Sequence, residues 1–148
     1  MSEEYILQVK DLHTSFFTDS GEVRAVNGVN FNLAPGKILG IVGESGSGKS
    51  VTAYSIMQIL ANTGKITSGE VLYKGQDITK FDKKQMRGFR GKCCSIIFQD
   101  PMTSLNPVYT IGNQLIEAIL LHTDKDKKQA KDRAVEMLEL VGVNEPQK

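Results

Sequence analysis

The sequence GESGSGKS, Gly43 to Ser50, matches in full the pattern G-x-x-x-x-G-K-[ST], in which a glycine-rich loop binds phosphate. Glycines in such a loop can adopt positive φ, so that backbone N–H groups close around phosphate oxygens. Lys49 can then reach the β and γ phosphates of a nucleotide, and the Ser50 hydroxyl can be a ligand of Mg²⁺. A glycine-rich turn without a ligand is the competing interpretation, but such a turn does not need Lys-Ser at its end. The predicted phosphate-binding residues are Gly43, Glu44, Ser45, Gly46, Ser47, Gly48, Lys49 and Ser50.

The segments on either side of this loop predict a strand, a tight loop and a helix in succession. The apolar run Ile38–Val42 does not alternate with polar residues, which is typical of a central parallel strand covered on both faces. From Lys49 to Leu60, apolar residues recur at helical spacing. Such a helix would present the positive end of its dipole to a bound phosphate. These elements together predict an α/β fold of the P-loop NTPase type.

Two segments before the loop predict an antiparallel pair of strands. Ile6–Leu12 alternates partly at a period of two residues and Val23–Leu33 does so more clearly, with the turn Asp19–Glu22 between them. Such a unit can supply a platform on which a nucleotide base stacks. Phe16, or less favourably Phe17, could stack on adenine, although phenylalanine is more often part of a core.

The second half of the chain predicts two further strands and two helices. A short strand is expected at Glu70–Tyr73. The apolar run Cys93–Phe98 predicts another strand, which ends at the sequence Gln99-Asp100-Pro101. Helical spacing of apolar residues predicts helices over Ile111–Leu121 and from near Asp124 to Val141.

Composition and charge limit the possible functions. The 148 residues contain 18 Lys plus Arg and 17 Asp plus Glu, so the formal net charge of +1 supplies no global field to hold nucleic acid. The basic run Lys83–Lys92 is best explained as a solvated helix face rather than a patch for phosphates or lipid headgroups. The adjacent Cys93 and Cys94 have poor geometry for a disulfide and are expected to be buried in a strand. No Asn precedes a Lys, so the N-K-x-D motif that reads guanine is absent.

Three stretches resemble the ATP-binding subunits of ABC transporters, and more narrowly those of the peptide and nickel importers. They are AVNGVNFNL at Ala25–Leu33, GESGSGKSVTAYSIM at Gly43–Met57 and IIFQDPMTSLNPVYTIGNQLIEAI at Ile96–Ile119. The resemblance implies part of one nucleotide-binding domain with a RecA-like core and an N-terminal antiparallel β subdomain. The β subdomain and the P-loop part would occupy residues 1–100, and the start of a helical subdomain would occupy residues 101–148.

The resemblance also implies functional residues outside the loop. In the family, the residue aligned with Phe16 stacks on adenine, and Val26 often lies near the base. Val51, directly after the loop, is also expected to bind the nucleotide. Gln99 aligns with a glutamine that approaches Mg²⁺ and the attacking water, a role that suits an amide because it can both donate and accept hydrogen bonds. The alternative is a glutamine at the end of a strand that bonds to its own turn. The implied cofactors are ATP and Mg²⁺, the implied catalytic residues are Lys49 and Gln99, and the implied Mg²⁺ ligands are Ser50 and Gln99.

Several parts of a complete ABC ATPase are not found in the sequence. No aspartate follows four apolar residues as a Walker B motif requires, there is no LSGGQ-type signature, and His13 and His122 fit surface or packing roles better than that of a switch histidine. We therefore expect a chain truncated before its signature motif, whose residues bind nucleotide without hydrolysing it. The leading hypothesis is a fragment of an ATPase subunit that powers uptake of di- or oligopeptides or nickel. The alternative is a non-hydrolysing nucleotide-binding or regulatory module, and a small-molecule kinase ranks third.

The resemblance implies partners and a location as well. The expected partners are a second ATP-binding subunit, preferably a paralogue, and permease subunits that contact the Q-loop region around Gln99. A substrate-binding protein would act indirectly through the permease. The chain itself has no secretory signal and no apolar run long enough to span a membrane, so peripheral association with the cytoplasmic face of the membrane is expected.

Overall fold

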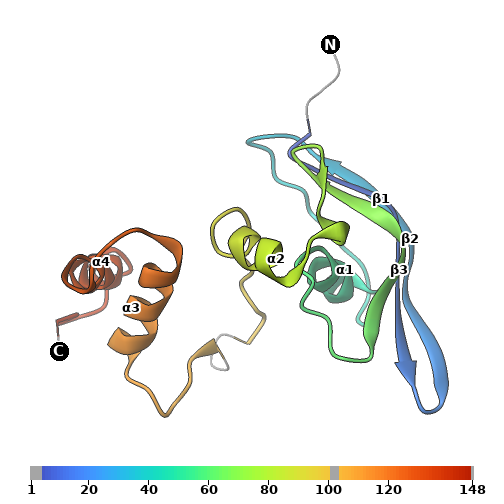
Figure 1. Ribbon diagram of the computed structural model, residues 1–148. Helices are drawn as coiled ribbons and strands as arrows, with labels where there is room; N and C mark the ends of the chain where they lie inside the picture. Colours follow the sequence, from blue (N-terminus) through green and yellow to red (C-terminus); the bar gives the residue numbers. More distant parts are fainter. Residues whose placement is uncertain (1–4, 101–103, 148) are drawn as a thin grey trace. The chain divides into compact units, whose positions relative to one another are not determined.

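The computed structural model describes residues 5–100 and 104–147, and the chain divides into two compact units, Met1–Ser95 and Ile96–Lys148 (Figure 1). Each unit is described by itself below.

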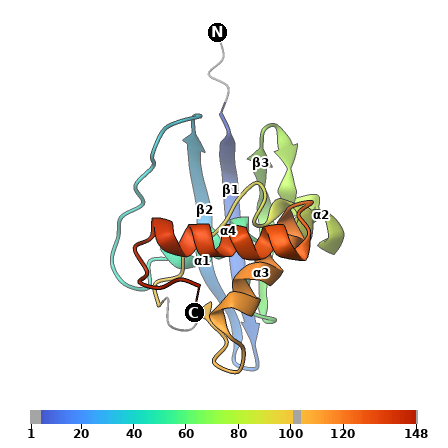
Figure 2. The same cartoon turned by 90° about the vertical axis from the view of Figure 1, so that its left-hand side faces the viewer.

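A four-stranded antiparallel sheet forms the frame of the first unit. β1 (Leu7–Thr18) lies between β2 (Gly21–Leu33) and β3 (Gly64–Tyr73), and the two-residue strand β4 (Gln76–Asp77) adds to β3. Figure 2 shows β2, β1 and β3 side by side. The predicted pair of N-terminal strands is confirmed, and β3 begins at Gly64 rather than at Glu70 because its first half also pairs with β1.

Two α-helices and a 3₁₀ turn lie on one face of this sheet (Figure 1). α1 (Lys49–Ile56) ends earlier than predicted. In the chain, η1 (Ile78–Lys80) and α2 (Lys83–Phe89) come after β4. Asp82 and Gln85 form a capping box at the start of α2, which fixes the beginning of that helix. The shared core consists of apolar side chains from all these elements: Val9, Leu12, Val26, Ile56, Met57, Val71, Ile78, Met86 and Phe89.

Arg90 joins the end of α2 to the end of α1. Its Nε donates to the Met57 carbonyl oxygen at 2.8 Å and its Nη2 donates to the Gln58 carbonyl oxygen at 2.5 Å. These carbonyls belong to the C-terminal end of α1, where helices leave acceptors unsatisfied and where a positive charge is favourable. Arg90 therefore fixes the far end of the helix whose first residue is Lys49.

The variant Arg90→Met should lower the free energy of unfolding by about 2 kcal/mol, because two partly buried carbonyls lose a charged donor while the aliphatic packing is kept. Urea titration followed by circular dichroism measures the change. Arg87→Met is the matched control, since Arg87 is an exposed residue of the same helix. Equal losses for the two variants would contradict the structural role of Arg90.

Two predicted strands are wrong. Residues 38–42 are irregular, with Ile38 99% and Val42 93% exposed, and residues 95–98 are irregular as well, with Ile97 94% exposed. A parallel strand needs neighbouring strands for its hydrogen bonds, and the sheet in the described part of the chain is antiparallel and pairs with neither segment. The apolar runs indicate that these segments can be buried, but they do not identify a strand with which either segment pairs.

The prediction for the two cysteines is also wrong. Cys93 is exposed and Cys94 is half-buried, and both lie in a turn that follows α2 rather than in a strand. The backbone N–H groups of both residues donate to the Phe89 carbonyl oxygen, at 2.9 and 3.2 Å. Burial raises the pKa of the Cys94 thiol, which disfavours the reactive thiolate.

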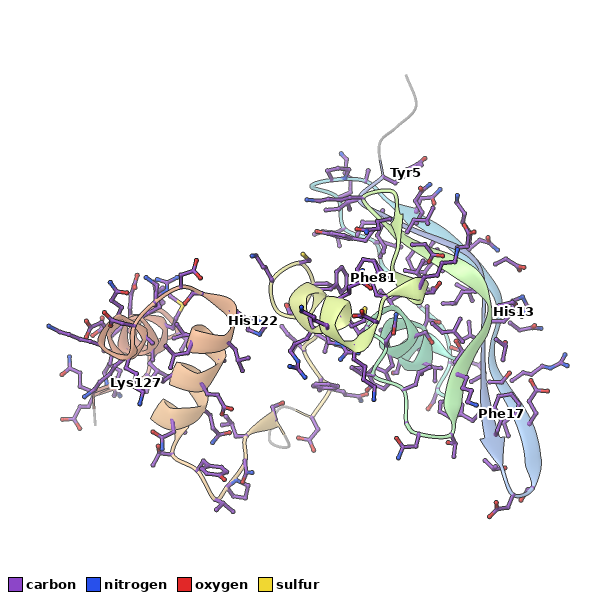
Figure 3. The ribbon with its side chains drawn as sticks, viewed as in Figure 1. Tyr5, His13, Phe17, Phe81, His122 and Lys127 are labelled. Atoms are coloured by element: carbon purple, nitrogen blue, oxygen red, sulfur yellow. The ribbon has the colours of Figure 1, made fainter. Side chains whose placement is uncertain are left out.

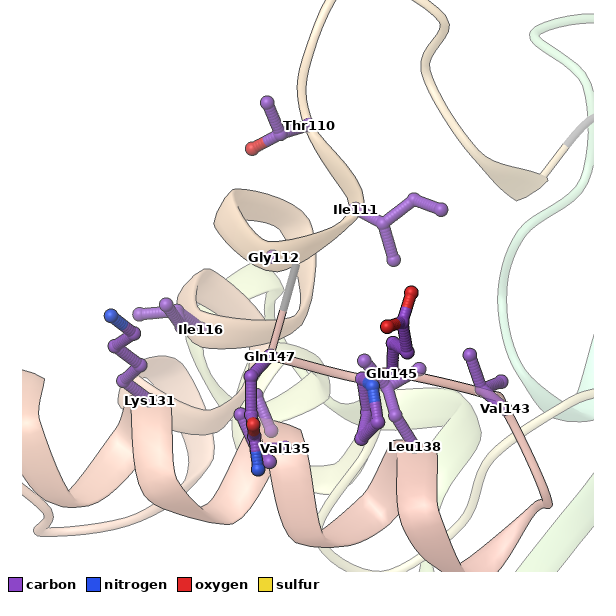
Figure 4. A pocket seen from close by; sticks show the side chains of 12 residues that line it. Thr110, Ile111, Gly112, Ile116, Lys131, Val135, Leu138, Val143, Glu145 and Gln147 are labelled. Carbon is purple, nitrogen blue, oxygen red and sulfur yellow. The ribbon is translucent and has the colours of Figure 1, made fainter.

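The second unit contains the two predicted helices. α3 (Ile111–His122) begins after the N-cap Thr110, and α4 (Lys127–Leu140) begins with a capping box formed by Asp126 and Gln129. The two helices, with the segment that follows α4, line a cavity of about 500 Å³ that is mostly apolar (Figure 4). None of the helices in the described ranges is long and apolar enough to cross a membrane.

Candidate functional site

The loop Gly43–Ser50 has a backbone that requires glycine at its end. Gly48 has φ +89°, a left-handed value that side chains disfavour. A Cβ on Gly48 would lie only 2.5 Å from the carbonyl oxygen of Ala25 on β2, and a Cβ on Gly43 would lie 2.7 Å from the Ser47 Oγ. The glycines therefore allow the loop to fold tightly on itself and to pack against the sheet.

Helix α1 begins directly after this loop, with Lys49 as its first residue. Among the residues that the structure describes, no side chain caps its N-terminus, and its first turn contains no acidic residue. The first N–H groups of a helix have no partner within the helix and lie at the positive end of its dipole. This end of α1 is thus suited to an anion such as a phosphate group.

The Lys49 ammonium group lies within the loop. Its Nζ donates to the carbonyl oxygens of Gly43 at 2.7 Å and Glu44 at 2.6 Å, and to the Ser47 Oγ at 3.2 Å. Because these acceptors belong to the same loop that is predicted to surround phosphate, the charge is held where phosphate oxygens would bind. The arrangement fits the predicted role of Lys49 as a charged contact to a polyphosphate.

Ser50 and Val51 differ in their surroundings although they are neighbours. Ser50 is exposed in the first turn of α1, where its hydroxyl is accessible to a metal ion bound with a phosphate. Val51 is half-buried and packs against the core. The side chain of Val51 therefore has a structural role, its backbone N–H lies in the first turn, and its contact with a nucleotide stays a prediction.

The sheet brings Val26 next to the loop. Val26 is 4% exposed, pairs with Thr14 of β1, and has its Cγ2 3.7 Å from the position that a Cβ on Gly48 would occupy. This buried position makes Val26 a support for the loop.

Phe16 and Phe17 lie near the end of β1 and differ in exposure. Phe16 is half-buried and pairs with Val23 on one side and Gly64 on the other. Phe17 is 45% exposed, lies near the β1–β2 turn (Figure 3), and has the Lys65 Nζ 5.9 Å from its ring centroid. The more fixed ring of Phe16 makes it the better candidate for stacking on a base, which stays a prediction.

Two residues that the sequence analysis missed connect β1 to α1. The hydroxyls of Thr14 and Ser55 form a buried hydrogen bond of 2.8 Å, and the Ser55 Oγ also donates to the Val51 carbonyl oxygen at 2.7 Å. A buried hydrogen bond of this kind fixes the strand that carries Phe16 relative to the helix that begins at Lys49. The available signal was Thr52 and Ser55, two small polar residues three apart on the buried face of α1.

Gln99 belongs to the second unit, where it is exposed in an irregular segment. Its predicted roles beside Mg²⁺ and at a permease contact therefore stay predictions.

Comparisons with known proteins give a consistent result. The sequence profile described as "ABC transporter" matches residues 26–148. The chain is 51% identical over 144 residues to the oligopeptide transport ATP-binding protein OppD of Bacillus subtilis, covering 97% of this chain and 40% of that protein. It is 46% identical over 143 residues to OppD of Escherichia coli, covering 97% of this chain and 42% of that protein. The chain thus spans less than half the length of these relatives.

Solved structures agree on the fold. The dimeric bacterial ABC transporter cassette MJ0796 matches with a TM-score of 0.75 at 21% identity, covering 94% of this chain and 58% of that one. The protein cbiO1 of Clostridium perfringens, part of the ABC transporter complex cbiONQ, matches with a TM-score of 0.66 at 26% identity, covering 96% and 52%. The predicted α/β fold of the P-loop NTPase type is confirmed. Since the family profile covers most of the chain and includes the loop Gly43–Ser50, the chain belongs to the ABC transporter family.

Proposed function

We propose that this chain binds ATP through the loop Gly43–Ser50, as part of the ATP-binding subunit of a peptide importer. The single observation that carries the proposal is the position of Lys49, whose Nζ lies among the loop's own acceptors directly before the uncapped start of α1. A cation, free backbone donors and a helix dipole then converge on one place, which suits the β and γ phosphates of a nucleotide.

The remaining residues of the site would contact different parts of the nucleotide. Ser50 and Gln99 would hold Mg²⁺, which when bound with ATP neutralises charge on the β and γ phosphate oxygens. Phe16 would stack on the adenine ring, with Val26 beneath the loop. The antiparallel sheet and the loop would form one part of a nucleotide-binding domain over residues 1–100, and α3 and α4 would begin a helical subdomain over residues 101–148.

Peptides are the favoured cargo because the names of the relatives refer to oligopeptide and dipeptide transport, and nickel is the less favoured alternative. In the whole protein, ATP binding and hydrolysis would drive uptake together with a second ATP-binding subunit, permease subunits and, indirectly, a substrate-binding protein. The subunit would associate peripherally with the cytoplasmic face of the membrane.

Residues 1–148 contain no Walker B carboxylate pair and no signature motif, which favours a second candidate for this polypeptide when it acts alone. We propose that these residues bind nucleotide and do not turn it over, because their sequence has no Walker B aspartate with an adjacent glutamate that could orient the attacking water. Magnesium dependence should then be weaker than in a complete subunit.

Calorimetry and phosphate release test both parts of this proposal. Titration of the chain with ATP should give saturable heat with and without Mg²⁺, while phosphate release should equal that of a protein-free control. Absence of saturable heat would contradict ATP binding. Phosphate release that saturates with ATP would contradict the proposal that these residues lack turnover.

A further inference from the structure

Gly64 lies directly opposite Phe16 in the sheet. It is the first residue of β3, and its Cα pairs with that of Phe16. Two backbone hydrogen bonds hold this point of the chain, from the Gly64 N–H to the Ala61 carbonyl oxygen at 2.8 Å and from the Phe17 N–H to the Thr63 carbonyl oxygen at 2.9 Å. The backbone beside the Phe16 ring is therefore fixed from both strands.

The Phe16 ring occupies the space that a side chain at position 64 would need. A Cβ on Gly64 would lie 2.8 Å from the Phe16 Cε1, 3.2 Å from its Cδ1 and 3.1 Å from the Leu60 Cβ. Gly64 is not among the glycines with positive φ, so its backbone conformation does not require glycine. The tightest of these contacts is with the aromatic ring, so the ring is the main obstacle to a larger residue.

The same end of the sheet carries the phosphate-binding loop. Gly48 packs against Ala25 and Val26 of β2, and on β1 the residues opposite this part of β2 are Thr14 and Ser15. Phe16 is the next residue along β1, and it is half-buried, so part of its ring remains accessible. An edge of the ring rests on Gly64 while the accessible part can meet a base whose phosphates are bound at the loop.

We propose that Gly64 is a positioning residue for the nucleotide base: its missing side chain sets the place of the Phe16 ring, and thereby the affinity for the adenine part of ATP. The inference rests on the proposed function, since it assigns to Phe16 the contact with the base. A methyl group at position 64 would lie only 2.8 Å from the Phe16 Cε1, closer than real Cβ contacts, so the ring would have to shift. Stacking depends on the distance and offset of the rings, so such a shift weakens it.

The test compares two ligands that differ in whether they contain a base. Gly64→Ala should weaken the binding of ATP by about threefold to tenfold and leave the binding of inorganic tripolyphosphate unchanged, both measured by calorimetry. Gly88→Ala is the matched control, because Gly88 also lacks a positive φ and has no atom within 4 Å of the position of an added Cβ. This control should change neither affinity.

A double-mutant cycle separates positioning from general packing. In a Phe16→Ala background, Gly64→Ala should cause no further loss of ATP affinity, because the ring that it displaces is gone. An equal loss for ATP and tripolyphosphate, or no loss for ATP, would overturn the inference. Failure of the unsubstituted chain to bind either ligand would instead refute the proposed function itself.

Folding of the variant provides a further check. If Gly64→Ala alone does not fold, the double variant Phe16→Leu/Gly64→Ala should fold, because the smaller side chain relieves the contact with the added methyl group. A double variant that also fails to fold would show that Phe16 is not what excludes a side chain at position 64, and would overturn the inference.

Discussion

Replacing Lys49 with alanine is expected to weaken ATP binding by about 100-fold, equivalent to about 2.7 kcal/mol. Hydrogen bonds to charged groups each contribute about 1.5–3 kcal/mol, and one ammonium group can donate to oxygens of two phosphates. The variant also loses the bonds from Nζ to the Gly43 and Glu44 carbonyl oxygens and the Ser47 Oγ, which hold the loop in its present shape. Calorimetric titration with ATP measures the loss directly.

Lys37→Ala is the matched control for this experiment. Lys37 is an exposed lysine in the turn that precedes the irregular segment 38–42, so its removal changes the net charge equally. It should leave the affinity for ATP within about twofold, since exposed charges at a distance are screened by salt. If Lys37→Ala and Lys49→Ala weakened binding to the same extent, the attraction would depend on net charge and the loop would not be the site.

The parts of the fold that the sequence predicted correctly carry their signal within one element. β1 and β2 alternate at a period of two residues and are joined by a short turn, while α3 and α4 repeat at helical spacing and begin with polar capping residues. Each of these patterns depends on which face of the element is buried, and the partner is the neighbouring element in the chain. Such information is local, and a single sequence is sufficient to read it.

The parts that could not be predicted depend on partners elsewhere. The apolar segments 38–42 and 95–98 were predicted as strands because they resemble buried parallel strands, yet a strand exists only when another strand satisfies its backbone. The turn at Cys93 and Cys94 shows the same limit, since its geometry follows from the end of α2 at Phe89. Composition indicates that such a segment can be buried and does not identify its neighbour.

The candidate site also has a part that the sequence predicts and a part that it does not. The loop and its lysine could be identified from residue types at fixed spacing, because phosphate binding requires them in that order. The supports of the loop could not, since Ala25, Thr14 and Ser55 come from three elements and act through one carbonyl group and two hydroxyls. Apart from the spacing of Thr52 and Ser55 on α1, nothing in their residue types distinguishes them from other small residues until the sheet and helix are packed together.

The strand that carries Phe16 has an irregularity earlier in its sequence. Between the pairs Lys10–Glu70 and His13–Ser68, two residues of β1, Asp11 and Leu12, face the single residue Gly69 of β3. Such a bulge bends the strand and changes which side chains face each side. It is held by the Asp11 N–H, which donates to the Asn30 Oδ1 at 2.8 Å.

Gly69→Ala should lower the free energy of unfolding by about 4 kcal/mol, the largest effect on stability that we expect from a single methyl group in this chain. Gly69 has φ +93°, and a Cβ there would lie 2.6 Å from the Asp11 carbonyl carbon and 2.7 Å from the Leu12 Cα. These neighbours are backbone atoms, which cannot move aside as a side chain can. Urea titration followed by circular dichroism measures the loss.

Gly75→Ala separates the two causes of this loss. Gly75 has a similar φ of +80° but has no atom within 4 Å of the position of an added Cβ, so alanine there should cost only the 1–2 kcal/mol of a left-handed backbone, as a rough figure. The difference between the two variants then measures the close approach of β1 to β3 at the bulge. Equal losses would mean that β1 moves away from Gly69 at little cost. In that case the bulge would not fix the position of β1 against β3 at Asp11 and Leu12.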